Sequence, residues 1–117
     1  MVKTKIYDCI TFFNENFLTN VRFEILNEVV DFFVICESKY DHKGNPKPIN
    51  FSLLNERYKN KVRHIIIKEQ FPNFKNGWKN EEYQREKIFD GIKDAELDDY
   101  IIIRTDGVYD IFCALCL

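Results

Sequence analysis

Apolar residues recur along the chain with two spacings, and these predict strands that alternate with helices. Segments rich in β-branched and aromatic residues predict strands at residues 5–11, 29–37, 62–67 and 100–104. Apolar residues at three- and four-residue steps predict helices at residues 16–27, 51–59 and 81–95. Such alternation favours parallel strand pairing with right-handed crossovers. We therefore expect a single α/β domain over residues 1–117, with a mostly parallel sheet of about four strands and helices on both faces.

The first long helix has an apolar stripe that predicts its buried face. Leu18, Val21, Ile25 and Val29 follow the helical spacing, and Arg22 intrudes on the same side. A stripe of this kind normally packs against the core. We expect it to face the sheet.

The last helix has a stripe that changes from polar to apolar along its length. Its positions, in order, are Glu81, Gln84, Arg85, Ile88, Ile92 and Ala95. The polar half lies near a helix N-terminus, which favours an anion such as phosphate. An ion pair between Glu81 and Arg85 explains the same pattern without a ligand. Trp78, one step ahead, is expected to anchor the core.

Polar residues gather where the predicted parallel strands end. Ligands bind at the carboxyl ends of such strands. These ends place Thr11 and Asn14, then Glu37, then Asp106 at one edge of the sheet. The segment 38–50, which is rich in Gly and Pro, is a candidate functional loop at the same edge. No glycine-rich phosphate loop is present, so a nicotinamide dehydrogenase and a P-loop nucleotidase are not supported.

Composition and charge exclude several classes of protein. The chain has 117 residues, 45% of them hydrophobic, with 17 basic and 19 acidic side chains. No Lys/Arg cluster suggests nucleic-acid binding. No apolar run approaches the length of a membrane span, so we expect a cytoplasmic or otherwise soluble protein. Cys9 and Cys36 lie in apolar strands and are expected to be reduced and buried.

Several segments together resemble glycosyltransferase family 17. They occur in a fixed order: 6–9 (IYDC), 11–15 (TFFNE), 30–34 (VDFFV), 44–48 (GNPKP), Trp78, 80–81 (NE), 84–85 (QR) and 98–99 (DD). Each segment is weak by itself, but their order and spacing across residues 6–103 are fairly specific. The resemblance covers most of the chain and stops before its last residues.

The resemblance implies a Rossmann-like, GT-A-type fold and transfer of N-acetylglucosamine from a UDP-sugar donor to a glycan acceptor. The donor-binding residues it implies are Thr11, Asn14, Glu37, Glu81, Gln84 and Arg85, with Asp8 near the nucleoside. It also implies a divalent metal, Mn²⁺ or Mg²⁺, held by acids that follow the last predicted strand. Here those acids are Asp106 and Asp110, four residues apart where the family has an Asp-x-Asp pair. No catalytic residue is identified.

Residues 104–117 depart from the family pattern and leave an alternative open. The chain is then a non-catalytic module of the same fold, which binds nucleotide or a protein partner. The apolar residues 111–117 would cover an edge of the sheet or form a homodimer contact. A redox role for Cys113 and Cys116 is a minor third possibility, because the C-x-x-C pair lacks the usual βαβ context.

Overall fold

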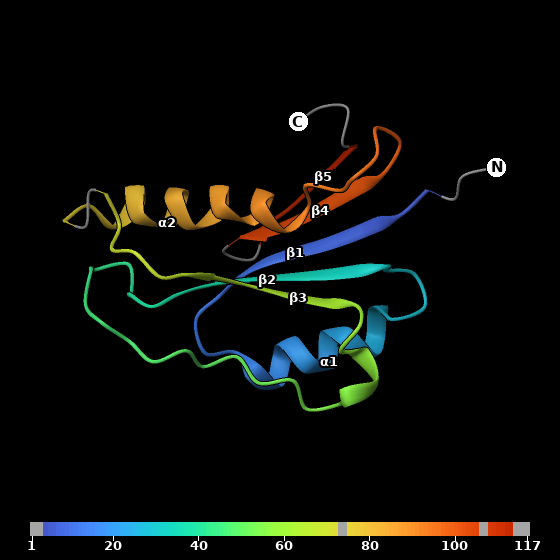
Figure 1. Cartoon of the computed structure of the whole chain (residues 1–117), viewed down its shortest axis with the longest axis horizontal. Coiled ribbons are helices and arrows are strands. Elements are labelled where there is room, and N and C mark those ends of the chain that lie inside the picture. Colours follow the sequence, from blue (N-terminus) through green and yellow to red (C-terminus); the bar gives the residue numbers. More distant parts are fainter. Residues whose placement is uncertain (1–3, 73–74, 106–107, 114–117) are drawn as a thin grey trace.

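Five strands form one sheet in the order β3-β2-β1-β4-β5. The computed structural model describes residues 4–72, 75–105 and 108–113, with side chains as far as Ile103 (Figure 1). The strands are β1 (Ile6–Phe12), β2 (Phe32–Ser38), β3 (Val62–Ile67), β4 (Tyr100–Thr105) and β5 (Val108–Cys113). The first four are parallel to one another, and β5 is antiparallel to β4. The predicted α/β fold with a mostly parallel, Rossmann-like sheet is confirmed.

Strand β5 is an addition that the sequence analysis did not predict as a strand. Its register on β4 runs from Thr105 opposite Val108 to Tyr100 opposite Cys113. The backbone of this part of the tail thus covers the outer edge of β4, one of the roles expected for it. An Asp-Gly pair between two apolar runs signals a β-hairpin, and this signal precedes β5 in the sequence.

The two helices lie on opposite faces of the sheet (Figure 1). Helix α1 (Asn16–Leu26) connects β1 to β2, and α2 (Gly77–Glu86) lies between β3 and β4 in the chain. Single turns of 3₁₀ helix follow at η1 (Glu56–Tyr58) and η2 (Lys87–Gly91). Among the described residues, neither helix has the length and apolar character that a membrane crossing requires.

Successive side chains of a strand point to opposite faces of the sheet, so the strands contribute to two separate cores. On the α2 side the buried cluster is Tyr7, Cys9, Val34, Cys36, Ile67, Ile88, Ile92, Ile101 and Ile103. On the α1 side it is Ile10, Phe12, Phe23, Val30, Phe33, Ile35 and Tyr58. Cys9 and Cys36 are buried and free, as predicted. Burial raises the pKa of the Cys36 thiol to about 12, so this thiol is inert at neutral pH.

The predicted buried face of α1 is wrong. Leu18, Val21 and Ile25 are exposed, and Ile25 has 73% of its surface accessible. The buried residues of α1 are Thr19, Asn20 and Phe23, on the opposite side of the helix. Phe23 packs against Phe33, with ring centroids 4.7 Å apart. The physical reason is that polar side chains of α1 form hydrogen bonds with distant segments of the chain, described below, and these bonds require that side of the helix to face inward.

The predicted continuous helix over 81–95 is also wrong in its second half. Helix α2 ends at Glu86 and the backbone tightens into η2. A close approach to the sheet accompanies the change, because a Cβ on Gly91, the last residue of η2, would lie 2.6 Å from Cγ1 of Val34 in β2. The chain approaches the sheet closely at this glycine, and Ile88 and Ile92 still reach the core. The segment 51–59 is likewise mostly irregular, with only η1 being helical.

Candidate functional site

A cavity of about 650 Å³ opens at the carboxyl ends of β1 and β2. Its walls come from the end of β1, the beginning of α1, the segment after β2 and one residue of α2. They are Ile10, Thr11, Phe12, Phe13, Glu15, Thr19, Ser38, Tyr40, Asp41, His42, Lys43, Asn45, Lys47 and Gln84. The cavity therefore lies at the edge of the sheet where parallel α/β folds bind ligands.

The segment 39–51 forms one wall of this cavity and begins with a tight turn. The N–H of Asp41 donates to the carbonyl of Asn45 at 2.9 Å, and Gly44 adopts a left-handed φ of 86° that suits glycine. The Asp41 carboxylate accepts the N–H groups of Lys43 and Asn45, both at 2.9 Å. Desolvation tends to raise the pKa of Asp41, but these N–H donors outweigh it and lower the pKa. The turn is thus held by its own aspartate.

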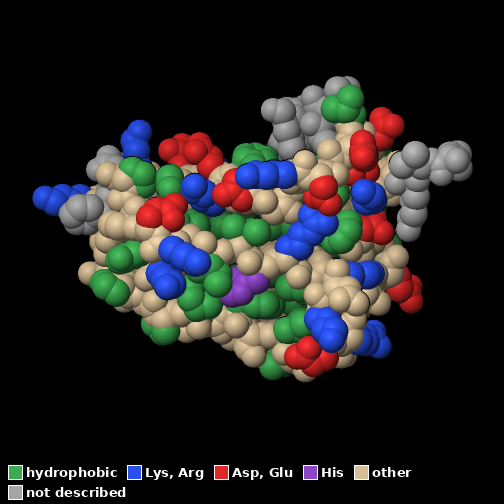
Figure 2. Space-filling view, in the orientation of Figure 1, with side chains coloured by type: hydrophobic (Ala, Val, Ile, Leu, Met, Phe, Trp, Pro, Cys, Tyr) green, Lys and Arg blue, Asp and Glu red, His purple; other side chains and the backbone are tan. Residues whose placement is uncertain are grey.

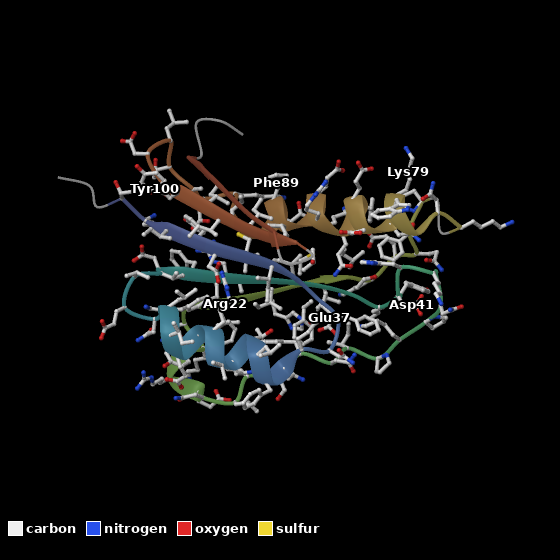
Figure 3. The ribbon with its side chains drawn as sticks, turned by 180° about the vertical axis from the view of Figure 1, so that it is seen from behind. Arg22, Glu37, Asp41, Lys79, Phe89 and Tyr100 are labelled. Atoms are coloured by element: carbon white, nitrogen blue, oxygen red, sulfur yellow. The ribbon has the colours of Figure 1, made fainter. Side chains whose placement is uncertain are left out.

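Glu37, the penultimate residue of β2, fastens this segment to the sheet (Figure 3). Its side chain is fully buried, and Oε2 accepts from Nζ of Lys47 at 2.9 Å and from the N–H of Asn50. Its Oε1 lies 3.1 Å from the N–H of Phe51 and 3.1 Å from Nε2 of His64. A buried carboxylate needs such partners to offset its desolvation. Glu37 thus joins the segment to both β2 and β3.

The partners of Glu37 keep its carboxyl group ionised. Burial by itself would raise the pKa, but the Asn50 N–H and the Lys47 ammonium outweigh it and lower the pKa of Glu37. Lys47 also donates to the carbonyls of Ser38 and Pro48, each at 2.9 Å. These three bonds use all three donors of the ammonium. Lys47 is therefore a largely buried structural cation.

Helix α2 holds the tip of the same segment with two buried amides. Asn80 donates from Nδ2 to the carbonyl of His42 at 2.8 Å. Gln84 lies 2.6 Å from Nε2 of His42 through its Oε1, and its Nε2 donates to the carbonyls of Phe12 and Cys36. One side chain thus joins β1, β2, α2 and the cavity wall.

Helix α1 holds the far end of the segment in the same way from the other face. Asn16 donates to the carbonyl of Asn50 at 2.6 Å and accepts the N–H of Ser52 at 2.8 Å. Asn20 donates to the carbonyl of Ser52 at 3.0 Å and accepts the N–H of Leu54 at 2.8 Å. Irregular backbone needs such partners when it is not part of a sheet or helix. These contacts explain why α1 turns polar residues inward.

The predicted donor-binding residues separate into three groups. Thr11 and Gln84 line the cavity. Glu37 lies beneath it, and its carboxylate is engaged by the protein itself. Asn14, Glu81 and Arg85 are not among the lining residues, and Arg85 is exposed on α2. The structure thus brings two of the six directly to the cavity.

Two further predictions for polar and aromatic residues can be compared with the structure. Asp8 is buried and forms a bidentate pair with Arg22, with both N···O distances 2.6 Å (Figure 3). This pair connects β1 to α1 and explains the arginine that interrupts the apolar stripe of α1. Trp78 is 81% exposed on α2, so its predicted role as a core anchor is wrong.

The comparisons with known proteins agree with the resemblance. Residues 1–111 match the family model described as Glycosyltransferase family 17. The curated relatives include the beta-1,4-mannosyl-glycoprotein 4-beta-N-acetylglucosaminyltransferases of Rattus norvegicus and Homo sapiens, each 33% identical over 113 residues. The alignment covers 87% of this chain and 21% of each relative. The chain belongs to glycosyltransferase family 17.

This family 17 chain spans about a fifth of the length of the curated relatives it matches. The Mus musculus protein of the same name is 32% identical with the same coverage. No solved structure shows a significant match to the chain.

The acids predicted to hold a metal fall at the end of the described part. Asp106 lies outside the described residues. Asp110 lies in β5 with its backbone opposite Ile103, and its side chain is not described. Asp110 is two residues from Val108, the first residue of β5, which corresponds to about 7 Å along the strand at the usual rise per residue. Within residues 4–72 and 75–103, no group of three His, Cys, Asp or Glu could hold a metal ion. The metal site at Asp106 and Asp110 stays a prediction.

Several residues that line the cavity were not singled out by sequence reasoning. They are Phe13, Glu15, Thr19, Ser38, Tyr40, Asp41, His42, Lys43 and Asn45. Six of the nine lie within the segment 38–50, whose Gly and Pro content marks it as a functional loop. The individual residues could not be chosen, because the contacts that orient them come from Glu37 and from two helices. The face seen in Figure 2 carries acidic and basic side chains interspersed, in keeping with the nearly balanced charge of the chain.

Proposed function

We propose that this chain forms the donor-binding part of a glycosyltransferase and binds UDP-N-acetylglucosamine in the cavity after β1 and β2. The observation that carries the proposal is the position of the cavity, at the ligand-binding edge of the sheet in a family 17 chain. The names of the curated relatives supply the sugar, N-acetylglucosamine, and the kind of acceptor, a mannosyl glycoprotein. The GT-A-type fold and the UDP donor are part of the same proposal.

The chemistry of the cavity suits a nucleotide sugar. Its volume of about 650 Å³ lies within the range of small-molecule sites. The half-exposed ring of Phe13 offers an apolar surface for a base. Thr11 and Ser38 supply hydroxyl groups, and Lys43 supplies a positive charge at the rim for the diphosphate.

The predicted site residues that do not line the cavity have other roles in the proposal. A divalent metal held by Asp106 and Asp110 would neutralise charge on the diphosphate when bound. Asn14, Glu81 and Arg85 would contact the donor from outside the cavity. Glu37 positions the segment that lines the cavity, because its carboxylate already has partners in the protein.

Calorimetric titration of the purified chain with UDP-N-acetylglucosamine, with and without Mn²⁺, tests this function. We expect saturable binding that Thr11→Val weakens and Arg85→Ala weakens less, with the melting temperature of both variants unchanged. Lys59→Ala, on the surface after η1, is a matched control that should bind as the parent chain does. Absence of binding in both metal conditions contradicts the proposal. Binding that is independent of Mn²⁺ contradicts only the part that concerns Asp106 and Asp110.

A second candidate is a non-catalytic module that associates with itself. The observation that favours it is the exposed apolar surface of α1, where Ile25 of the stripe and Phe17 beside the stripe are each 73% exposed. The sequence predicts a homodimer contact elsewhere, in the apolar residues 111–117. Sedimentation over a range of protein concentrations distinguishes the candidates, because a mass that rises with concentration supports this one.

A further inference from the structure

The amide of Gln84 can have only one orientation in this structure. One end of the amide faces the carbonyl oxygens of Phe12 and Cys36, at 3.3 Å and 2.9 Å. Only the NH₂ group can donate to two carbonyls, since an oxygen there would face two other oxygens. The other end, Oε1, must therefore be an acceptor. Gln84 is 4% exposed, so water does not compete for these bonds.

This orientation determines the tautomer of His42. Its Nε2 lies 2.6 Å from Oε1 of Gln84, and an acceptor at that distance requires a proton on Nε2. In a neutral imidazole with a proton on Nε2, Nδ1 carries the free lone pair. The network on Gln84 thus prepares Nδ1 of His42 as an acceptor.

His42 is also held in place at the edge of the cavity. Its ring packs edge-on against Phe71, with centroids 6.1 Å apart, and its carbonyl accepts from Asn80. The same residue is exposed and belongs to the cavity wall. A side chain restrained by an amide, an aromatic ring and its own backbone contact, yet open to the cavity, is preorganised for a ligand.

We infer that His42 contacts the nucleotide-sugar ligand through Nδ1, which accepts a hydrogen bond from a ligand hydroxyl, and that Gln84 is the positioning residue for this contact. The inference rests on the proposed function for the identity of the ligand. It goes beyond that function because it assigns the contact to two residues and specifies a tautomer.

Affinity for the ligand should depend on pH, because the proposed hydrogen bond requires the free lone pair on Nδ1 of His42. The charged residues of its own segment in the cavity wall are Asp41, Lys43 and Lys47, and Glu15 lines the same cavity from the beginning of α1. From α2 His42 is faced by the uncharged amides of Asn80 and Gln84, and from the segment after β3 by the ring of Phe71. Protonation of Nδ1 removes the acceptor, so affinity should be lower at acidic pH than at neutral pH. A histidine that binds phosphate instead would show higher affinity at the lower pH.

Long-range ¹H–¹⁵N spectra of the imidazole groups test the tautomer and the contact on the intact chain. We expect His42 to be the Nε2–H tautomer in the free protein, and its Nδ1 resonance to shift on addition of UDP-N-acetylglucosamine. His64, bonded to Glu37 outside the cavity wall, is an internal reference that should not shift. An Nδ1–H tautomer overturns the role of Gln84. Saturable binding without a shift at His42 overturns the contact, whereas absence of binding overturns the proposed function together with the contact.

Variants give an independent measurement. His42→Ala removes one hydrogen bond to the ligand and should weaken binding about tenfold. It should also lower the melting temperature, because Oε1 of the buried Gln84 loses its partner. Gln84→Met keeps the length of the side chain and removes its polar atoms. We expect the folded variant to show a mixture of His42 tautomers and weaker binding than the parent, in addition to any loss of stability. Unchanged affinity in His42→Ala overturns the inference even if Gln84→Met fails to fold.

Discussion

Helices α1 and α2 cover opposite faces of the sheet, and both bury amide side chains where a helix normally buries apolar ones. Asn20 of α1 holds the backbone of residues 52–54, and Asn80 and Gln84 of α2 hold His42. The irregular segment between β2 and β3 is therefore clamped from both faces. The comparison shows that polar residues in a helical stripe need not contact a ligand, because they can position an irregular segment that lines a cavity.

The helices differ in what they do with the rest of their surface. Helix α2 places Gln84 in the cavity wall and leaves the outer residues Lys79 and Trp78 to solvent (Figure 3). Helix α1 leaves a whole apolar stripe exposed, while Phe23 alone supplies its aromatic contact with the sheet. Stability on this face should therefore depend on few side chains.

The largest expected effect compares the two sides of α1. Phe23→Ala should lower the free energy of unfolding by about 3–5 kcal/mol, because it opens a cavity in the core. Ile25→Ala, two residues away on the exposed side, should change it by less than about 0.5 kcal/mol. Urea denaturation of both variants measures the difference. Equal losses would mean that the stripe of α1 is buried in solution.

A smaller effect compares the amides of the two helices. Asn20→Ala and Asn80→Ala should each cost about 1–3 kcal/mol, because each leaves partly buried backbone groups without a partner. Hydrogen exchange distinguishes them. Asn20→Ala should speed exchange at the Leu54 N–H, which bonds to Asn20, without affecting the turn at Asp41. Faster exchange throughout the sheet would show instead that the amides support the whole fold.

Glu37, which anchors the segment held by both helices, should make the stability of the fold depend on pH. The pKa of Glu37 is lowered in the folded chain, so its ionised form stabilises the fold at neutral pH. This stabilisation is present above the unfolded pKa, about 4.3 for Glu, and is lost as pH falls through the lower folded pKa. Glu37→Gln should flatten this part of the stability curve, as measured by thermal unfolding at several pH values. An unchanged pH profile would mean that other acids control the transition.

The smallest expected effect concerns the outer face of α2. Trp78→Ala should change the free energy of unfolding by less than about 0.5 kcal/mol, because the side chain is 81% exposed. Indole fluorescence of the parent chain should also be quenched readily by acrylamide. A loss of stability comparable with that of Phe23→Ala would place Trp78 in a packed environment.

Part of the candidate site was predictable and part was not. The edge of the sheet at which the cavity opens and Thr11 in its wall follow from strand direction. Gln84 follows from the polar half of the last helical stripe, and the segment 38–50 from its composition. His42 and Asp41 could not be chosen within that segment, because Asn80, Gln84 and Gly44 orient them through contacts or backbone geometry that periodicity does not reveal. The metal acids Asp106 and Asp110 stay a prediction.

The sequence by itself determined the α/β class, the four parallel strands and the buried cysteines, because these depend on local spacing and on continuous apolar runs. Only the tertiary structure decided which face of α1 is buried, where α2 ends and what Glu37 binds. Each of these depends on a partner distant in sequence: Asp8 for Arg22, Val34 for Gly91, and Lys47 with His64 for Glu37. Hydrophobic spacing describes how residues of one helix share a face. It cannot show that a buried hydrogen bond from another segment is strong enough to turn that face the other way.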